Sequence, residues 1–374
     1  MRIVFAGGGT GGHLFPGVAL AQAIVRRDPS AEPFFLCTER PIDARHLSRY
    51  GLPYRVLPGQ RLQGLRKSGV AAFPALMRAY HSAWKNVERL APSAMVGLGG
   101  YAMVGPALAA AWFGIPLVLL EQNVVPGKAV RFCSRFARKI CGQWDVTGPR
   151  FRRRPDLYEA TGNPLRAEMI PIPREQALRE VELSPEKRTL LVMGGSQGAS
   201  GVDRVILQHG EALKDLAARV QVVHLCGGDN EANVRAKYAA LGVTARVFPF
   251  FERMPVLYSA ADMALARAGG TAIAEMCFFG VPMVLVPLPH AADNHQFRNA
   301  LEIAKHKGGF VQAERDWNPG WFKNYLDTLL LDDRRRTEFS RHARSLSRPQ
   351  AAERVANIVL QLAASHRTPQ GALA

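Results

Sequence analysis

Residues 1–13 read MRIVFAGGGTGGH, and residues 189–199 read TLLVMGGSQGA. In both segments an apolar run typical of a buried β-strand leads into glycines and then into a helical pattern. Backbone N–H groups at such a strand–turn–helix transition attract anions, at the sheet edge where parallel α/β folds bind ligands. Neither turn contains the G-K-[ST] of a P-loop. Two such turns at equivalent places favour ligand binding over a purely structural role for the glycines.

Short apolar runs alternate with amphipathic stretches around both turns. The strands predicted in the first half are residues 2–6, 33–38, 54–57, 94–98, 117–120 and 139–141, and the helices are 15–26, 71–90 and 106–113. The strands predicted in the second half are residues 189–193, 220–225, 245–250, 263–266 and 283–287, and the helices are 201–217, 255–261, 271–279 and 295–306. Apolar strands separated by helices are typical of a parallel sheet covered on both faces. The sequence therefore predicts an α/β fold with two similar doubly wound domains in tandem.

The length of 374 residues fits two domains of ordinary size. A stretch rich in proline and charge separates the halves, and the pattern from Trp321 to Ser365 is almost wholly helical. We therefore expect an N-terminal domain at 1–162, a linker at 163–188, a C-terminal domain at 189–345 and a C-terminal helix at 346–374. This last helix is expected to pack back toward the N-terminal domain.

The composition excludes several classes of protein. The sequence has 48% hydrophobic and 21% charged residues, which fits neither a disordered chain nor a small disulfide-stabilised domain. The net charge of +17 indicates a polyanion, an anionic membrane surface or phosphorylated ligands. Five scattered cysteines without a C-x-x-C pair argue against a disulfide framework or a zinc site and favour a reducing cytoplasm. We interpret the charge run at 332–348 as a solvated helix face.

The first half contains two stretches relevant to membranes. Residues 102–120 carry no charge, but glycine and proline interrupt them twice, which predicts a buried helix followed by a buried strand. Farther upstream, apolar residues are interleaved with cations, namely Leu62, Leu65, Val70, Phe73, Leu76, Met77 and Trp84 with Arg61, Arg66, Lys67, Arg78 and Lys85. Such a mixture suits an interfacial contact with anionic lipid, and the loop at 59–69 is the better candidate because residues 71–90 also fit an ordinary packed helix.

Two further glycine clusters follow predicted strands. GLGGYAMVGP at 97–106 occupies the same topological position as the first turn. ARAGGTAIAE at 266–275 places two glycines and Thr271 at a helix start, with Glu275 one turn later. A carboxylate there can accept hydrogen bonds from ribose hydroxyls, and it can equally be a favourable partner of the helix dipole.

Seven motifs in register resemble one family. They are GGGTGGH at 7–13, GLGGY at 97–101, LEQN at 120–123, GNPLR at 162–166, GGSQGA at 194–199, ARAGGTAIAE at 266–275 and PLPHAADNHQFRNA at 287–300. Together they are similar to the MurG family, the N-acetylglucosaminyltransferases of bacterial peptidoglycan synthesis. The resemblance runs from the first residues to about Gly309.

The resemblance implies a GT-B fold, with two Rossmann-like domains facing across a cleft. It implies transfer of N-acetylglucosamine from UDP-N-acetylglucosamine (UDP-GlcNAc) to undecaprenyl-diphospho-N-acetylmuramoyl-pentapeptide (lipid I), which yields lipid II. It also implies a peripheral enzyme at the cytoplasmic face of the inner membrane, with a role in cell wall biogenesis, cell shape and division. The partners would then be the two substrates, an anionic membrane surface and other cell-wall synthesis proteins, without nucleic acid.

The donor site follows from the same resemblance. Arg166 would supply a cation to the diphosphate, the main chain near Phe251 would hold uracil, and Glu275 would hold the ribose hydroxyls. The residues that the resemblance assigns to UDP-GlcNAc are Thr10, Gly11, Gly12, Asn123, Arg166, Ser196, Gln197, Phe251, Gly270, Thr271, Ala272, Glu275, His295 and Gln296.

The acceptor site is assigned to the first half. The residues that the resemblance places there are Gly8, Gly9, Thr10, Gly11, Gly12, His13, Tyr101, Glu121, Gln122 and Asn123. Two departures fall on this side. Leu120 stands where the family usually has His, and the loop from Gly99 to Pro106 is one residue longer than the common pattern.

Two catalytic candidates emerge, His13 and Glu121. His13 titrates near neutral pH and ends a glycine turn, so it suits a general base, although a phosphate-binding role is equally open. Glu121 is the alternative base. The leaving diphosphate can be stabilised by a helix start and by Arg166, and no D-x-D element lies near a site segment. We therefore expect no metal and no cofactor, and catalysis that survives chelation.

Rival functions remain open at this point. A diacylglycerol glycosyltransferase would share the donor half, and a UDP-GlcNAc 2-epimerase would share the architecture and act on the donor alone. A basic nucleic-acid-binding protein would use the positive charge but would leave the glycine turns and Glu275 unexplained.

Overall fold

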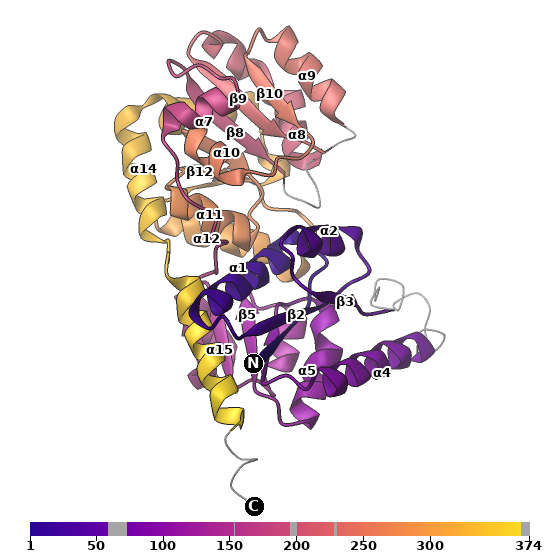
Figure 1. The fold of residues 1–374 in the computed structure, drawn as a ribbon. Helices are drawn as coiled ribbons and strands as arrows, with labels where there is room; N and C mark the ends of the chain where they lie inside the picture. The colour runs from indigo at the N-terminus through magenta and orange to yellow at the C-terminus, as the bar shows by residue number, and fades with distance from the viewer. Residues whose placement is uncertain (59–72, 153, 195–199, 228–229, 368–374) are drawn as a thin grey trace, which may run out of the picture. The chain divides into compact units, whose positions relative to one another are not determined.

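The structure divides the chain into two units, each built on one parallel sheet (Figure 1). The computed structural model describes residues 1–58, 73–152, 154–194, 200–227 and 230–367. The first unit comprises Met1–Ala167 with Arg348–Ala374, and the second comprises Glu168–Ser347.

The sheet of the first unit has seven strands. They are β1 (Arg2–Ala6), β2 (Glu32–Cys37), β3 (Tyr54–Val56), β4 (Ala94–Gly97), β5 (Leu117–Glu121), β6 (Lys139–Gly142) and β7 (Tyr158–Ala160). Their order is β3-β2-β1-β4-β5-β6-β7, and all pairs are parallel. The strand order reverses at β1, so the carboxyl ends of β1 and β4 lie side by side at the switch point where such sheets bind ligands.

Helices cover both faces of this sheet. They are α1 (Gly11–Arg27), α2 (Pro41–Arg49), α4 (Phe73–Leu90), α5 (Val104–Trp112), α6 (Lys128–Cys133) and α15 (Ala351–Arg367). Side chains alternate along β1, so Ile3 and Phe5 join the core under α1 and α15, whereas Val4 joins the core under α4 and α5. α15 packs against α1, although the two helices lie at opposite ends of the chain (Figure 1).

The second unit repeats the design with six strands. They are β8 (Arg188–Met193), β9 (Val220–Leu225), β10 (Ala245–Phe248), β11 (Met263–Ala266), β12 (Met283–Leu285) and β13 (Gly309–Val311), in the order β10-β9-β8-β11-β12-β13. The helices are α7 (Arg174–Glu180), α8 (Ser200–His209), α9 (Glu231–Ala240), α10 (Met254–Ala260), α11 (Gly270–Phe279), α12 (His295–Lys305), α13 (Pro319–Tyr325) and α14 (Asp333–Ser345). Here the order reverses at β8, beside β11.

The predicted α/β class and the two parallel sheets are confirmed. The uncharged stretch 102–120 forms α5 and then β5, as expected. One predicted helix differs, because α8 ends at His209 and continues as a 3-10 helix, Gly210–Leu216. Among the described residues, no helix combines the length and the apolar character that crossing a membrane requires.

Several elements were not anticipated. β7 and β13 are strands of only three residues at the sheet edges, too short to show a periodic pattern. α7 lies in the charged stretch 163–188 and packs against α10 within the second unit, so this stretch is more than a connection. The expected domain boundaries remain predictions.

Candidate functional site

The first glycine turn follows β1 at the switch point of the first sheet. Gly7, Gly8 and Gly9 have φ values of +134°, +132° and +83°, which side chains rarely adopt. A Cβ on Gly7 would lie 2.7 Å from the Gly99 carbonyl oxygen, and one on Gly8 would lie 2.5 Å from Oδ2 of Asp43. The turn therefore requires glycine for both its conformation and its close contacts.

A buried carboxylate holds this turn from the α2 side. The Gly9 amide donates to Oδ1 and Oδ2 of Asp43 at 2.9 and 2.8 Å, and the amide and hydroxyl of Thr38 donate to Oδ2 at 3.1 and 2.6 Å. Arg40 donates to the Gly9 carbonyl at 2.7 Å. The Gly9 N–H is thus engaged by Asp43, so the anion attraction expected here rests on the start of α1 at Gly11.

Sequence reasoning missed Asp43, Thr38 and Arg40. In the sequence, Thr38 and Arg40 are marked only by their position directly after β2, and Asp43 only by its position in the first turn of α2. Asp43 is completely buried, which the sequence pattern does not reveal.

His13 lies in the first turn of α1, beside the second glycine cluster. Its Nδ1 is 3.4 Å from the Thr10 hydroxyl. A Cβ on Gly99 would lie 2.9 Å from Cδ2 of His13, so the imidazole packs against the turn that follows β4. The ring is half-buried, and Tyr101, after the same turn, is 55% exposed. The imidazole and the phenol therefore border the same sheet edge.

Glu121 ends β5 and organises the loop that follows it. Its Oε1 accepts from the amide and side chain of Asn123 at 2.9 and 3.1 Å, and its Oε2 accepts from the Gly127 amide at 2.8 Å. Burial raises the pKa of Glu121 to about 7, and the hydrogen bonds from Asn123 and Gly127 oppose that rise. Gln122 is also buried. The carboxylate therefore positions Asn123, while Leu120, where the family usually has His, belongs to the apolar core.

Arg166 lies in the first unit, close to its boundary. Its Nη1 donates to the Tyr50 hydroxyl at 3.0 Å, and its guanidinium carbon is 4.2 Å from the centroid of the Phe15 ring. The side chain is 7% exposed. Packing against an aromatic ring holds this cation in one orientation.

In the second unit, two predicted segments follow β8 and β11, which are neighbouring strands. Gly194 is buried at the end of β8, whereas Ser196 and Gln197 lie outside the described residues. After β11, Gly270 starts α11, and its first turns contain Thr271, Ala272 and Glu275. The Tyr258 hydroxyl donates to Oε2 of Glu275 at 2.8 Å, and both Thr271 and Glu275 are buried.

The other predicted donor residues follow β10 and β12. Phe251 is half-buried, with its ring 5.0 Å from that of Phe248. His295 and Gln296 begin α12, where Oε1 of Gln296 accepts from the Leu288 amide at 3.0 Å and Nδ1 of His295 is 2.8 Å from the Ala292 carbonyl. Phe251 follows the edge strand β10, two strands away from β8.

The structure therefore brings the predicted residues together at two sheet edges. Thr10 to His13, Gly99 to Tyr101 and Glu121 to Asn123 follow the neighbouring strands β1, β4 and β5. The segments at 270–275 and 295–296 follow β11 and β12 in the second unit. Across the part of the chain that the structure describes, no three His, Cys, Asp or Glu residues gather as metal ligands would.

A polar network in the second unit was not predicted, and three of its members, Asp203, His224 and Tyr238, are buried. Nε2 of His224 is 3.1 Å from Oδ1 of Asp203, and its Nδ1 is 3.0 Å from the Tyr238 hydroxyl. Asn230 donates to Oδ2 of Asp203 at 2.9 Å. The network joins α8 to β9 and to the start of α9. In the sequence, only the presence of Asp203 and His224 within largely apolar stretches hints at this network.

Comparisons with known proteins agree with this geometry. The glycosyltransferase family 28 N-terminal domain matches residues 3–141, and the family's C-terminal domain matches residues 189–355. A protein of Anaeromyxobacter sp. (strain K) is 34% identical over 367 residues, which span 97% of this chain and 93% of that protein. It bears the name UDP-N-acetylglucosamine--N-acetylmuramyl-(pentapeptide) pyrophosphoryl-undecaprenol N-acetylglucosamine transferase.

Two solved structures resemble the chain. The crystal structure of MurG from Acinetobacter baumannii has a TM-score of 0.75 and 28% sequence identity, and the match covers 96% of this chain and 99% of that one. The UDP-GlcNAc 2-epimerase from Neisseria meningitidis, bound to UDP-GlcNAc, has a TM-score of 0.67 and 14% identity, with 96% and 100% of the two chains covered. The second likeness concerns the fold alone.

Proposed function

Because the chain belongs to the MurG family of glycosyltransferase family 28, we propose that it transfers N-acetylglucosamine from UDP-GlcNAc to lipid I and thereby makes lipid II. The observation that carries this function is the 34% identity over 97% of the chain to a transferase of that name. The geometry supports it, because a glycine turn and a helix start meet at the carboxyl edge of each sheet.

The reaction is an in-line displacement at the anomeric carbon of the donor. The 4-hydroxyl of the muramoyl sugar forms the new bond, the bond from the anomeric carbon to the diphosphate oxygen breaks, and UDP leaves with inversion. His13 is the better candidate to take the hydroxyl proton, because its imidazole is half-buried at the sheet edge. Glu121 is 3% exposed and already accepts three hydrogen bonds, so its role in this proposal is to position Asn123.

The second unit supplies the donor site in this proposal. The N-terminal end of α11 attracts the diphosphate through its amides, at Gly270, Thr271 and Ala272. Tyr258 orients the carboxylate of Glu275, which accepts from the ribose hydroxyls. The Leu288 amide orients the side chain of Gln296 by donating to its Oε1. In this proposal the Nε2 group of Gln296 donates to the donor sugar. These groups act without a metal, and we expect turnover to survive EDTA.

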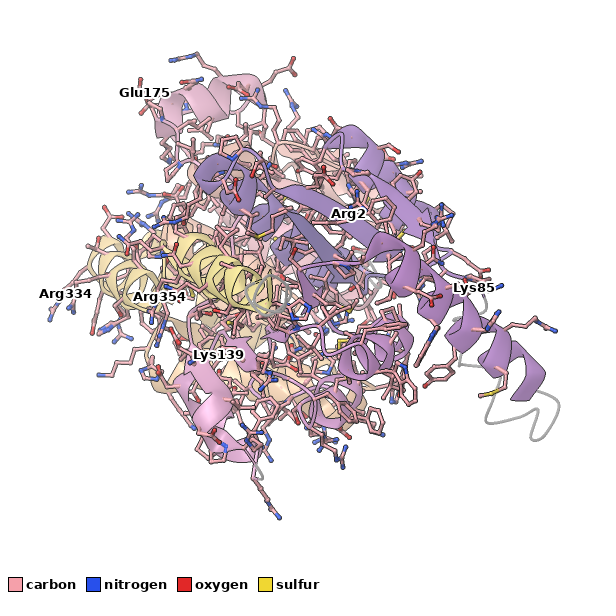
Figure 2. All side chains as sticks on the ribbon, turned by 60° about the horizontal axis from the view of Figure 1, so that its bottom comes forward. Arg2, Lys85, Lys139, Glu175, Arg334 and Arg354 are labelled. Carbon is pink, nitrogen blue, oxygen red and sulfur yellow. The ribbon has the colours of Figure 1, made fainter. Side chains whose placement is uncertain are left out.

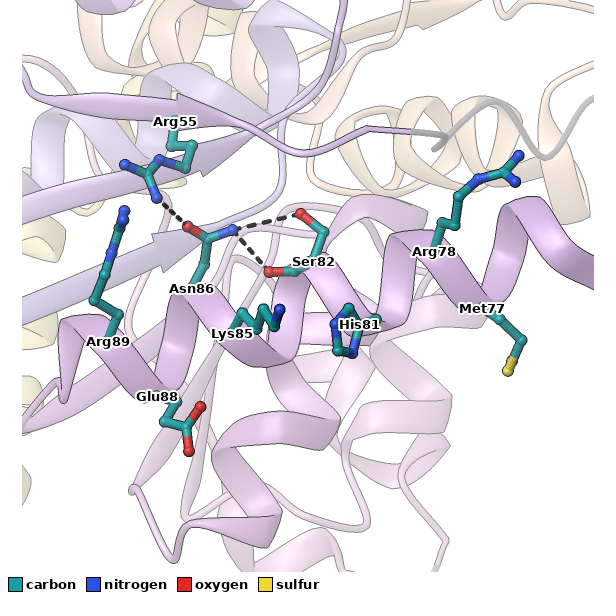
Figure 3. A pocket seen from close by; sticks show the side chains of 9 residues that line it. All are labelled: Arg55, Met77, Arg78, His81, Ser82, Lys85, Asn86, Glu88 and Arg89. Atoms are coloured by element: carbon teal, nitrogen blue, oxygen red, sulfur yellow. Dashed lines mark hydrogen bonds between the residues drawn. The ribbon is translucent and has the colours of Figure 1, made fainter.

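A basic, partly apolar surface on α4 supports association with an anionic membrane. A pocket between α4 and β3 is lined by the cations Arg55, Arg78, Lys85 and Arg89, with Met77 at one end (Figure 3). Arg55 donates to Oδ1 of Asn86 at 2.7 Å, which ties β3 to the helix.

Exposed aromatic groups lie on the neighbouring helix. Trp112 at the end of α5 is 74% exposed, and its ring is 5.2 Å from that of Trp84 on α4. Exposed apolar side chains on helices that also carry cations suit the interface of an anionic leaflet. We therefore place α4 and α5 against the cytoplasmic face of the inner membrane. The loop 59–69, predicted to make the contact, lies outside the described residues.

One assay tests the function and its rivals. Purified enzyme is given radiolabelled UDP-GlcNAc with a lipid I analogue, with a diacylglycerol acceptor, or with no acceptor. We expect label in the muramoyl lipid only, and UDP release only when that lipid is present. UDP release from the donor alone would indicate the epimerase, and label in diacylglycerol would indicate the other transferase.

The base assignment needs a matched pair of variants. His13→Ala should lower kcat by a factor of about 10² to 10⁴ while UDP binding is kept. His209→Ala, a half-buried histidine at the end of α8, serves as the control. Near-normal turnover of His13→Ala would shift the role of base to Glu121.

A further inference from the structure

A second concave surface of the first unit is lined by arginines. It lies between α6 and the segment before β7 and encloses a cavity of about 490 Å³. Five arginines line it, namely Arg131, Arg135, Arg150, Arg152 and Arg154, and Val125, Pro126 and Phe151 supply its apolar part. Among the described residues that line it, none is a lysine or carries a carboxylate.

The described residues supply little negative charge to four of these arginines, Arg135, Arg150, Arg152 and Arg154. Arg154 forms an ion pair with Asp156 at 3.5 Å, in which both side chains are at least half exposed. Arg135 donates to the Phe132 carbonyl at 3.2 Å, which is a neutral partner. For Arg135, Arg150 and Arg152, no carboxylate among the described residues lies within ion-pairing distance. Guanidinium groups gathered around a hollow repel one another, so an anion in the hollow would be stabilised.

The chemistry of the lining selects the kind of anion. A guanidinium presents a planar fork of N–H donors that matches the two oxygens of a carboxylate, whereas an ammonium group acts as a point charge. The guanidinium groups of Arg135, Arg150 and Arg152, together with the apolar part of the pocket, fit a ligand with carboxylates on a partly apolar chain. A peptide that ends in a free carboxylate has this character.

The loop that contains Asn123 also supplies two residues of the pocket. Val125 and Pro126 belong to the loop from Glu121 to Gly127, and the carboxylate of Glu121 holds that loop at Asn123 and at Gly127. Asn123 is one of the residues assigned to the acceptor. A group attached to the acceptor sugar therefore has a short path from Asn123 to the arginines.

We propose that this arginine pocket binds the carboxylates of the acceptor's peptide stem. The proposal rests on the function above, which makes a muramoyl-pentapeptide lipid the acceptor. Binding energy from this remote contact lowers KM for the acceptor and leaves the chemical step at His13 unchanged, because the stem does not react.

The test pairs a change in the protein with a change in the ligand. The double variant Arg150→Gln/Arg152→Gln and the wild type are assayed with a lipid I analogue and with the same analogue whose stem carboxylates are amidated. We expect amidation to raise the wild-type KM roughly tenfold and the double variant to lose that discrimination. The kcat and the KM for UDP-GlcNAc should stay within twofold.

Controls separate this effect from others. Arg334→Gln/Arg335→Gln on α14 removes the same charge from the second unit and should leave the discrimination intact. Calorimetric binding of a free muramoyl-pentapeptide, compared with its amidated form, gives the same comparison without turnover. UDP binding and circular dichroism report whether each variant is folded.

The other outcomes distinguish failure of this proposal from failure of the proposed function. If the KM of the double variant is raised equally for both analogues, or is unchanged for both, the pocket does not recognise the carboxylates of the stem. If it loses binding to phosphatidylglycerol vesicles while discrimination persists, the pocket serves a lipid headgroup phosphate. If the wild type transfers to no muramoyl acceptor yet calorimetry shows charge-dependent peptide binding, the proposed function fails and the pocket assignment stands.

Discussion

At the scale of single residues, Glu121 links a loop conformation to pH. Its carboxylate is buried at the end of β5, and burial raises its pKa from 4.5 to about 7. The folded protein therefore holds a proton on Glu121 that the unfolded chain has already released at intermediate pH. This group's contribution to stability is complete below pH 4.5 and is lost as the pH rises through about 7.

Glu121→Gln should remove this pH dependence, because the amide resembles the neutral acid and cannot ionise. We expect the free energy of unfolding of the wild type to fall relative to the variant by about 3 kcal/mol between pH 5 and 8. Urea denaturation of both proteins across that range measures the difference. Parallel curves would contradict the assignment, and Glu32→Gln in an exposed ion pair serves as the control.

The element scale shows how buried groups tie helices to strands. Asp203 on α8 is completely buried and is bound by His224 on β9 and by Asn230 at the start of α9. Burial alone would raise the pKa of Asp203, but the hydrogen bonds from His224 and Asn230 outweigh it and lower the pKa. The stability from this carboxylate is therefore present above its usual pKa and is lost as the pH falls below that range.

Asp203→Ala should cost about 3 kcal/mol or more of stability, because His224 and Asn230 would keep buried polar groups without their acceptor. It should also weaken UDP binding, since α8 follows the second glycine turn. Chemical denaturation and UDP titration measure both effects. Asp215→Ala, an exposed carboxylate after α8, is the control, and equal losses in the two variants would count against the network.

The last helix of the chain is part of the first unit's core. Val355, Ala356 and Val359 on α15 are buried with Leu14 and Leu20 of α1. Val359→Ala should lower the free energy of unfolding by about 2 kcal/mol through lost burial and a cavity. Gln361→Ala, an exposed position of the same helix, should change it little. Thermal unfolding of the two variants distinguishes a packed helix from an appended one.

At the scale of the whole molecule, nearly all of the net charge of +17 belongs to the first unit, whereas basic and acidic residues almost balance in the second. Figure 2 shows the cationic side chains of Lys85 on α4, Arg334 on α14 and Arg354 on α15 projecting from their helices. Some of this charge is balanced, as in the pair of Arg354 with Glu159 at 3.0 Å. The cations of α4 differ, because Arg78, Lys85 and Arg89 line one pocket together with the exposed Met77.

The free energy of binding to phosphatidylglycerol vesicles should therefore have an electrostatic contribution and an apolar contribution. The electrostatic part should weaken as salt rises from about 0.05 to 0.5 M, because counterions screen exposed charges. Trp112→Ala should weaken binding at every salt concentration, since it removes apolar contact. Ile170→Ala, which removes an exposed apolar side chain from the second unit, is the control in vesicle sedimentation. Salt-independent binding would refute the electrostatic part.

The sequence could predict the elements whose residues carry a strong local pattern. β1, β9 and β11 have the predicted bounds, because buried parallel strands are apolar on both faces. The first glycine turn was also predicted, and the positive φ angles at Gly7 to Gly9 explain why glycine stands there. β7 and β13 escaped prediction because three residues at a sheet edge carry no periodic signal.

The amino-acid order alone therefore determined the α/β class, the tandem halves and the glycine turn after the first strand, because these depend on periodicity and glycine content within short windows. Only the tertiary structure decided that Asp43 engages Gly9, that Glu121 is turned into its own loop, that Arg166 packs on Phe15 and that arginines from two segments line one pocket. The contacts of Asp43 and Arg166 and the arginine pocket depend on residues far apart in the chain, which strand order brings together, whereas the contacts of Glu121 are local and depend on its burial.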